Sequence, residues 1–275
     1  MTNGQEPRCW REEIDAEGIV WLTLDKPGAS VNTLSSSVLE ELGEIVASLK
    51  LRSPRSVVLQ SGKPSGFVLG ADVKEFTTLR SVDEARALVE RGHRVLADLE
   101  SLPCPSVALI EGFALGGGLE LALACRYRVG VNDDRLTLGL PEVMLGIHPG
   151  FGGTVRAVRT IGSLAALDLM LTGRNVKGAK TKTLGLVDRL ADNRESATRL
   201  CRELIQRNPG AHRPPLMQRL ASLGVVRQLL RSKLEAQVAR KVRKAHYPAP
   251  YAIIDRKSTR LNSSHVSESR MPSSA

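Results

Sequence analysis

The sequence predicts an α/β fold in which buried, mostly parallel strands alternate with amphipathic helices. Short runs rich in β-branched and other apolar residues recur along the first 190 residues, and segments with helical periodicity lie between them. Turn residues, mainly Gly and Pro, separate these runs. The chain has 275 residues, of which 42% are hydrophobic, so it can bury a sizeable core. Strands alternating with helices indicate a sheet that helices cover.

The first predicted strand spans residues 19–24, and the turn 25–28 ends it. Residues 35–51 place apolar side chains at a period of 3.6, which predicts an amphipathic helix. The same reasoning gives the remaining elements, which are strands at 55–60, 106–110 and 127–131 and helices at 82–99 and 116–125.

The later part of the chain has a different pattern. Strand character ends at Asp188, and we expect a basic helical segment or connector over 191–255, with its helical patterns running to about Lys244. Seven of the twenty residues in 256–275 are Ser, and no periodicity is present. We therefore expect a disordered, non-native tail there, which resembles translated vector sequence. The predicted organisation is therefore a core over 1–190, a connector and a tail.

Composition excludes several classes of protein. Aromatic residues make up 3% of the chain, which disfavours a surface that stacks nucleic-acid bases. The net charge of +10 is concentrated in residues 199–244, where twelve Lys or Arg face two acidic residues, so we expect a solvated or docking helix face and no nucleic-acid partner. No apolar run suggests a membrane span or a signal peptide. The four scattered cysteines indicate a reducing, cytoplasmic location and no metal site.

Two glycine-containing loops are candidate ligand sites. Residues 65–72 form a loop after a predicted strand, and residues 116–118 are three consecutive glycines before a predicted helix. The first N–H groups of a helix lack helical partners and lie at the positive end of its dipole, so they suit an anion or a developing oxyanion. A tight turn with close packing is the structural alternative. Neither a dinucleotide-binding nor a Gly-x-Ser-x-Gly fingerprint is present, so neither NAD binding nor serine hydrolysis has a motif.

Two carboxylates accompany these loops. Glu120 lies in the first turn of the helix after the triple glycine, and Glu142 follows Pro141 in a segment that continues to Gly153. Either one alone is more often a solvated side chain or a partner of the helix dipole. Two carboxyl groups beside one oxyanion site would supply the acid and the base that add water to a polarised double bond.

The motifs at 67–76, 111–122 and 138–154 resemble those of the enoyl-CoA hydratase/isomerase (crotonase) family, in the same order and spacing. Together with residues 27–34 they cover about residues 15–190, and they are most similar to the hydratase part of bacterial multifunctional fatty-acid oxidation α subunits. The resemblance implies a crotonase (ClpP-like) spiral of ββα units followed by a C-terminal helical segment.

The resemblance also implies roles for individual residues. The backbone N–H groups of Ala71 and Gly117 match the oxyanion hole, and Glu120 and Glu142 match the two catalytic glutamates. Both glutamates would orient the attacking water, and Glu142 would also exchange the α-carbon proton. His148 receives no role. The coenzyme A groove and the acyl site would be lined by Val31, Leu69, Gly70, Asp72, Val73, Phe113, Pro141 and Gly150.

The implied activity is hydration of trans-2-enoyl-CoA to 3-hydroxyacyl-CoA in β-oxidation, with isomerase side activity compatible. The alternatives are an enoyl-CoA delta isomerase and, for a truncated piece, a non-catalytic acyl-CoA-binding or subunit-docking module. We expect no cofactor, since coenzyme A belongs to the substrate, and no NAD-dependent dehydrogenase activity. The expected partner is a thiolase subunit or further copies of this chain.

Overall fold

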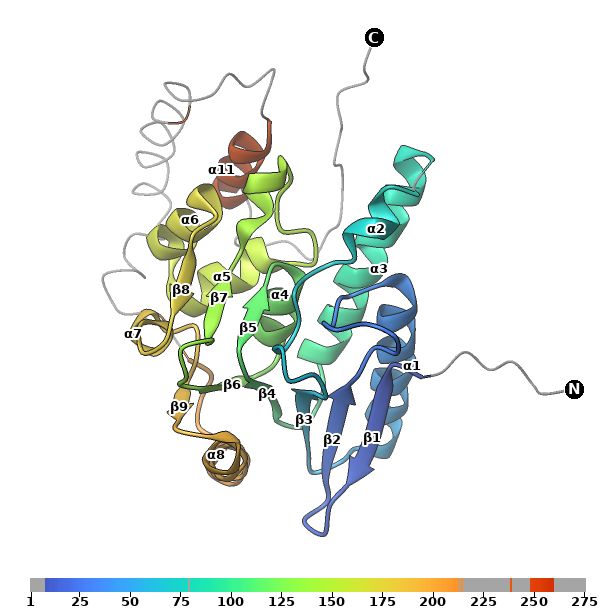
Figure 1. Cartoon of the computed structure of the whole chain (residues 1–275), viewed down its shortest axis with the longest axis vertical. Coiled ribbons are helices and arrows are strands. Elements are labelled where there is room, and N and C mark those ends of the chain that lie inside the picture. The colour runs from blue at the N-terminus through green and yellow to red at the C-terminus, as the bar shows by residue number, and fades with distance from the viewer. Residues whose placement is uncertain (1–7, 79, 213, 215–237, 239–247, 260–275) are drawn as a thin grey trace, which may run out of the picture.

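The computed structural model describes residues 8–78, 80–212, 214, 238 and 248–259. Two sheets form the framework, with helices packed around them (Figure 1). The larger sheet has the strand order β1-β2-β3-β4-β6-β9, and every neighbouring pair is parallel except β1 with β2. Its strands are β1 (Trp10–Ile14), β2 (Ile19–Leu24), β3 (Ser56–Ser61), β4 (Ser106–Ile110), β6 (Tyr127–Val131) and β9 (Arg189–Ala191). The predicted α/β class with mostly parallel strands is confirmed.

The smaller sheet consists of β5 (Phe113–Leu115), β7 (Thr137–Gly139) and β8 (Asn175–Lys177). Strands β5 and β7 are parallel, and β8 is antiparallel to β7. The helices are α1 (Ser36–Arg52), α2 (Val73–Phe76), α3 (Val82–Glu100), α4 (Gly117–Ala124), the 3-10 helix η1 (Pro141–Leu145), α5 (Gly153–Ile161), α6 (Ser163–Thr172), α7 (Lys180–Leu184), α8 (Arg194–Arg207) and α11 (Ala249–Thr259).

Side-chain caps determine where the long helices begin. The Ser35 side chain accepts a hydrogen bond from the Val38 N–H at the start of α1, and Ser81 caps α3 in the same way through the Glu84 N–H. At α8, Asn193 and Ser196 form a reciprocal capping box. These caps satisfy N–H groups that have no partner within the helix.

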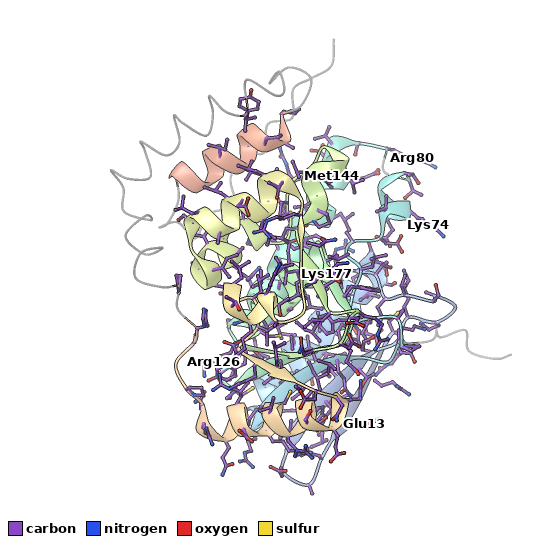
Figure 2. All side chains as sticks on the ribbon, turned by 60° about the vertical axis from the view of Figure 1, so that its left-hand side comes forward. Glu13, Lys74, Arg80, Arg126, Met144 and Lys177 are labelled. Atoms are coloured by element: carbon purple, nitrogen blue, oxygen red, sulfur yellow. The ribbon has the colours of Figure 1, made fainter. Side chains whose placement is uncertain are left out.

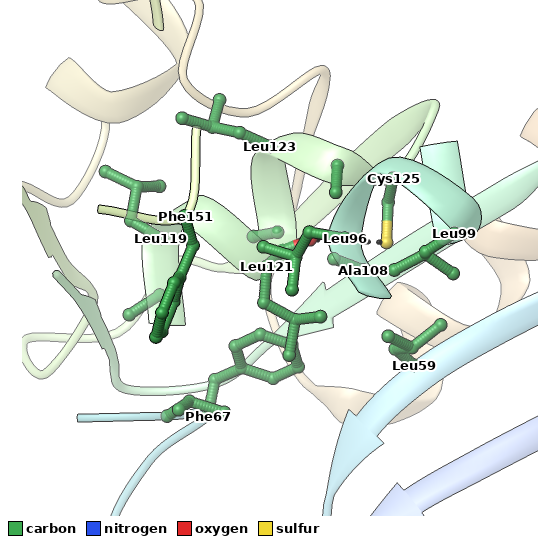
Figure 3. Packing of buried hydrophobic residues seen from close by; sticks show 14 of the residues in the cluster. Leu59, Phe67, Leu96, Leu99, Ala108, Leu119, Leu121, Leu123, Cys125 and Phe151 are labelled. Atoms are coloured by element: carbon green, nitrogen blue, oxygen red, sulfur yellow. Dashed lines mark hydrogen bonds between the residues drawn. The ribbon is translucent and has the colours of Figure 1, made fainter. Parts of the chain in front are cut away.

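The period of two along the strands divides the buried residues between two cores. In β2, Val20 and Leu22 face the core beneath α1, α3 and α4, whereas Ile19 and Trp21 face the core beneath α8. The larger core holds the site helix in place: Leu119 and Leu121 of α4 pack in the same cluster as Phe67 and Phe151 (Figure 3). Because α4 is buried on all sides, its first turn has a fixed position.

One prediction about the later chain is wrong. Residues 189–191 form β9, which pairs with β6, so strand character does not end at Asp188. Helix α11 runs from Ala249 to Thr259. The helical patterns predicted over 213, 215–237 and 239–244, and the tail from residue 260 on, lie outside the described residues. The domain boundaries themselves stay predictions.

None of the helices in the described ranges is long and apolar enough to cross a membrane. Within the same ranges, no three His, Cys, Asp or Glu side chains are grouped so that they could hold a metal ion.

Candidate active site

The triple glycine is required by a close approach between two segments. A Cβ atom built at Gly118 would clash with the carbonyl oxygen of Val68, which belongs to the segment after β3. Gly116 has φ 52° and ψ −128°, a conformation that L side chains rarely adopt. These glycines bring the start of α4 directly against the loop that contains Gly70 and Ala71.

Two backbone N–H groups lie side by side at this contact. A Cβ atom on Gly117 would lie 3.3 Å from the Ala71 nitrogen, and one on Gly70 would lie 3.8 Å from the Gly117 nitrogen. Among the described residues, neither the Ala71 N–H nor the Gly117 N–H donates a hydrogen bond. The Ala71 segment is nevertheless fixed, because Leu34 forms a parallel bridge with it. Two adjacent free donors at a helix start are suited to an oxyanion.

Glu120 is buried at 2% exposure in the first turn of α4. One carboxylate oxygen, Oε1, accepts hydrogen bonds from the backbone N–H groups of Phe151 (2.9 Å) and Gly153 (2.6 Å). A Cβ atom on Gly153 would lie 2.8 Å from this same oxygen, so glycine is needed for that approach. The loop before α5 therefore fixes the Glu120 side chain.

Glu142 lies in the first turn of η1 and faces the glycine turn before α4. Its Oε1 would be 3.3 Å from a Cβ atom built at Gly116. Both of its carboxylate oxygens are buried, and neither has a hydrogen-bond partner in the described part of the chain. A buried polar group of this kind needs a partner, and a substrate or a water molecule can provide one.

Burial changes the acidity of both carboxyl groups. Desolvation raises the pKa of Glu120 to about 7, although the N–H groups of Gly153 and Phe151 and the charge of Arg156 oppose the rise. Desolvation, together with the negative charge of Glu120, raises the pKa of Glu142 to about 8. Near neutral pH the pair can therefore hold one proton acceptor and one proton donor.

The predicted coenzyme A residues lie on the rim next to the Ala71 loop. Leu69 is 43% exposed and Val73 is 55% exposed, and the Leu69 N–H donates to the Asn32 carbonyl beside Val31. Asp72 caps α2 and pairs with Lys26 at 2.6 Å, which holds the pKa of this carboxyl below its usual value.

Figure 2 shows Lys74 of α2 and Met144 of η1 at the same upper end of the molecule, far from Glu13 of β1. Of the predicted acyl-site residues, Pro141 begins η1 next to Glu142, and Gly150 adjoins Val89 of α3. Phe113 lies at the other end of β5, where its ring contacts Gly66.

Three residues of the site were not singled out from the sequence. Phe151 and Gly153 supply the donors to Glu120, and Arg156 is buried behind them at 5% exposure. The signal available was the glycine-rich run 150–153, which showed that a special loop was present but not what its N–H groups contact.

A family model described as enoyl-CoA hydratase/isomerase matches residues 15–249. The fatty acid oxidation complex subunit alpha of Vibrio cholerae serotype O1 is 41% identical over 248 residues, which cover 88% of this chain and 35% of the relative. Its counterpart from Shewanella frigidimarina is 40% identical, with 87% of this chain and 34% of the relative covered. The chain thus spans about a third of the length of the curated relatives it matches.

Solved structures have the same fold. The enoyl-CoA hydratase from Bacillus anthracis has a TM-score of 0.67 and 27% identity, covering 91% of this chain and 90% of that chain. The enoyl-CoA hydratase/carnithine racemase from Magnetospirillum magneticum has a TM-score of 0.66 and 26% identity over 74% of this chain and 75% of that chain. The fold is therefore the crotonase fold, as the sequence motifs implied. With its paired glutamates, its two free N–H groups and these matches, the chain belongs to the enoyl-CoA hydratase/isomerase family.

Proposed function

We propose that this chain is an enoyl-CoA hydratase of fatty-acid oxidation, which adds water to trans-2-enoyl-CoA and gives 3-hydroxyacyl-CoA. One observation supports this above the others. Two free N–H groups, from Ala71 and Gly117, lie beside two buried carboxyl groups whose pKa values are raised. That combination provides an oxyanion hole, a base and an acid in one place.

The oxyanion hole makes the substrate reactive. Water is a poor nucleophile toward a conjugated thioester, so the β-carbon must be made electron-poor. Hydrogen bonds from the Ala71 and Gly117 N–H groups to the thioester oxygen stabilise the negative charge that develops there in the enolate. In other enzymes one such donor contributes on the order of 3–4 kcal/mol to the barrier.

The two glutamates then divide the proton transfers. Both orient the attacking water. Glu120, whose negative charge the Phe151 and Gly153 N–H groups stabilise, accepts a proton as the water oxygen bonds to the β-carbon. Glu142, whose oxygens have no such donors within the described ranges, donates a proton to the α-carbon. A proton returned from Glu120 to Glu142 restores the site. Addition of water leaves the oxidation state of the substrate unchanged, so the proposed reaction needs no redox cofactor.

The substrate is proposed to lie across the rim already described. The coenzyme A part would run past Val31, Leu69, Asp72 and Val73, and Gly70 leaves space beside the thioester. The exposed side chains of Leu69 and Val73 offer apolar contact area for it. The acyl chain would extend toward Pro141, Gly150 and Phe113.

The presence of two carboxyl groups distinguishes a hydratase from the alternatives. Moving a double bond requires one proton shuttle, and an acyl-CoA-binding module requires none, so neither explains a second buried glutamate. An acyl-CoA substrate and membership of a complex are in keeping with the names of the relatives. A thiolase or like-chain partner and a cytoplasmic location stay predictions.

The test uses the full chain with crotonyl-CoA and with a medium-chain 2-enoyl-CoA. Catalytic loss of the conjugated-thioester absorbance, with 3-hydroxyacyl-CoA as the product, is the expected result. The same protein is given 3-enoyl-CoA to measure isomerisation. A folded chain that isomerises 3-enoyl-CoA without hydrating 2-enoyl-CoA, or that binds acyl-CoA without consuming it, would contradict the proposal.

A further inference from the structure

The loop before α5 holds Glu120 in an asymmetric way. Both N–H donors, from Phe151 and Gly153, point at the same oxygen, Oε1. A backbone hydrogen bond from Gly150, in the same loop, also acts on this carboxylate and lowers its pKa. The loop thus determines the orientation of the Glu120 side chain.

Arg156 fixes this loop from the side of α5. Its guanidinium Nη1 donates to the carbonyl oxygen of Phe151 at 2.6 Å, and its Nε donates to Glu100 at the end of α3 at 2.8 Å. The guanidinium lies directly against Gly152, where a Cβ atom would clash with Nη1 and where φ is +100°. Planar, forked donors such as these fix the orientation of the groups they bind.

The ring of Phe151 fixes the loop from the opposite side. It packs against Gly92 of α3 so closely that a Cβ atom at Gly92 would clash with the ring. The same ring lies 3.2 Å from the position of a Cβ atom on Gly117. The absence of a side chain at Gly92 therefore decides where the Phe151 backbone, and its N–H group, can lie.

We propose that Arg156 is a positioning residue, which together with the Gly92–Phe151 contact holds the loop so that the Glu120 carboxylate keeps the orientation it needs toward the attacking water. The inference rests on the proposed hydratase function. Arg156 touches neither the substrate nor the reacting atoms in this scheme, and it acts through the carbonyl oxygen of Phe151 and through its charge near Glu120.

The charges around Glu120 give the effect a measurable pH signature. Glu142 of η1 and Arg156 of α5 act on Glu120 electrostatically, and Nε2 of His93 on α3 lies 3.5 Å from the position of a Cβ atom on Gly152. Removal of the Arg156 charge takes away a stabilising influence on the ionised form of Glu120. The acidic limb of the kcat–pH profile should therefore shift to higher pH.

The experiment compares Arg156→Met with Arg159→Met in the full chain. Arg159 pairs with the same Glu100 carboxylate but is 59% exposed, and within the described residues it forms no hydrogen bond or ion pair with the loop, so it is the matched control. For Arg156→Met we expect kcat to fall on the order of 10–100-fold, with a smaller change in KM and the shifted acidic limb. Arg159→Met should keep the parent kcat and profile. An Arg156→Met protein with parental kcat and profile would overturn the proposal.

Gly92→Ala provides a second test if Arg156→Met does not fold. Alanine favours a helix more than glycine does, so a loss of activity would not come from helix propensity. We expect kcat to fall as in Arg156→Met, and most of this fall to be absent when Gly92→Ala is added to Glu120→Gln; a small remainder reports the contact of the Phe151 ring with Gly117. A further fall of the same size would contradict the proposed route.

The two proposals can fail separately. If the parent hydrates enoyl-CoA and the Glu120→Gln variant does not, the hydratase function is supported. Unchanged kcat in Arg156→Met would then overturn only the positioning role. If the parent does not turn over enoyl-CoA, the hydratase proposal fails. Amide hydrogen exchange then still tests whether Arg156 holds the loop before α5. The Phe151 and Gly153 amides should exchange faster in Arg156→Met than in Arg159→Met.

Discussion

Glu120 and Glu142 are identical side chains in one site, but the protein surrounds them differently. Glu120 is held by two N–H groups from a loop that Arg156 and Gly92 fix, whereas neither oxygen of Glu142 has a partner in the described part of the chain. Both are buried, and burial raises both pKa values. The donors and the positive charge near Glu120 offset part of that rise, and the charge of Glu120 adds to the rise at Glu142.

The difference teaches how one residue type can serve as base and acid at the same pH. Glu120, whose ionised form is stabilised by fixed N–H donors, is expected to lose its proton first. Glu142, which has no such donors in the described part of the chain, is expected to keep its proton. The different surroundings of the two carboxyl groups, and not the presence of two glutamates alone, support the proposed division of roles. The following predictions test this comparison.

The largest effect is expected from removing either carboxylate. Glu120→Gln and Glu142→Gln should each lower hydratase kcat by roughly 10²–10⁴-fold, since each removes one proton-transfer partner. Glu195→Gln is the control, because the Glu195 side chain is 82% exposed and, among the described residues, pairs only with Arg199 on α8, and it should leave the rate unchanged. Steady-state hydration of crotonyl-CoA checks this prediction. Parental turnover in either site variant would show that the two glutamates are not both needed.

Gly117→Val should lower kcat by about 10²–10³-fold with both carboxylates intact. The new side chain would enter the space 3.3 Å from the Ala71 nitrogen, where the thioester oxygen has to lie. Gly210→Ala, at a position with open space around it, is the matched control. The measurement is kcat for the two variants, with circular dichroism as the test of folding. A Gly117→Val protein with normal kcat would place the oxyanion site elsewhere.

Glu142→Gln should change the pH dependence of stability. The parent folds with a carboxyl whose pKa rises from 4.5 to about 8, so the folded state retains a proton that the unfolded chain has released. This contribution is fully present below pH 4.5 and is lost as the pH rises through about 8.

Over that window the unfolding free energy of the parent should fall relative to Glu142→Gln by up to about 1.4 kcal/mol per pH unit. Urea unfolding at pH 5 and at pH 8 measures the difference. If the unfolding free energies of the two proteins depend on pH in the same way, the pKa of Glu142 is not raised in the folded state.

The smallest effect concerns Asp72, a carboxylate on the rim whose pKa is lowered by its hydrogen bond to Lys26. Its contribution to stability is present above the unfolded value of 3.8 and is lost as the pH falls through the lower folded value. Lys26→Met should therefore reduce stability at pH 7 by less than about 1 kcal/mol, since the pair is partly solvated. Urea unfolding from pH 7 down through the acid range checks this, and a deficit that does not shrink as the pH falls below 3.8 would contradict it.

The sequence predicted the two longest helices and four strands of the larger sheet, but it missed β1, α5, α6 and the shortest strands. Residues 36–52 and 82–100 are long enough for a clear helical period, and 19–24, 106–110 and 127–131 are apolar runs bounded by turns. Strands β5, β7, β8 and β9 have three residues each, too few for any period to show. They form because neighbouring backbone segments pair with them.

Part of the site could also be predicted. The glycine motifs and Glu120 and Glu142 were found because they are local patterns that resemble a known family. The contact of Arg156 with Glu100, and of the Phe151 ring with Gly92, joins residues far apart in the sequence. Such pairs depend on how α3 packs against α4 and α5, which no local pattern specifies.

The most direct test of the difference between Glu120 and Glu142 is a carbon-13 NMR titration of the glutamate carboxyl groups in the full chain. The Glu120→Gln and Glu142→Gln variants assign the two resonances. We predict two carboxyls that titrate well above 4.5, with Glu120 ionising before Glu142. In Glu120→Gln, the Glu142 pKa should fall but stay above 4.5, because burial remains after the neighbouring charge is gone. Titration of both near 4.5, or ionisation of Glu142 first, would contradict the assignment of base and acid.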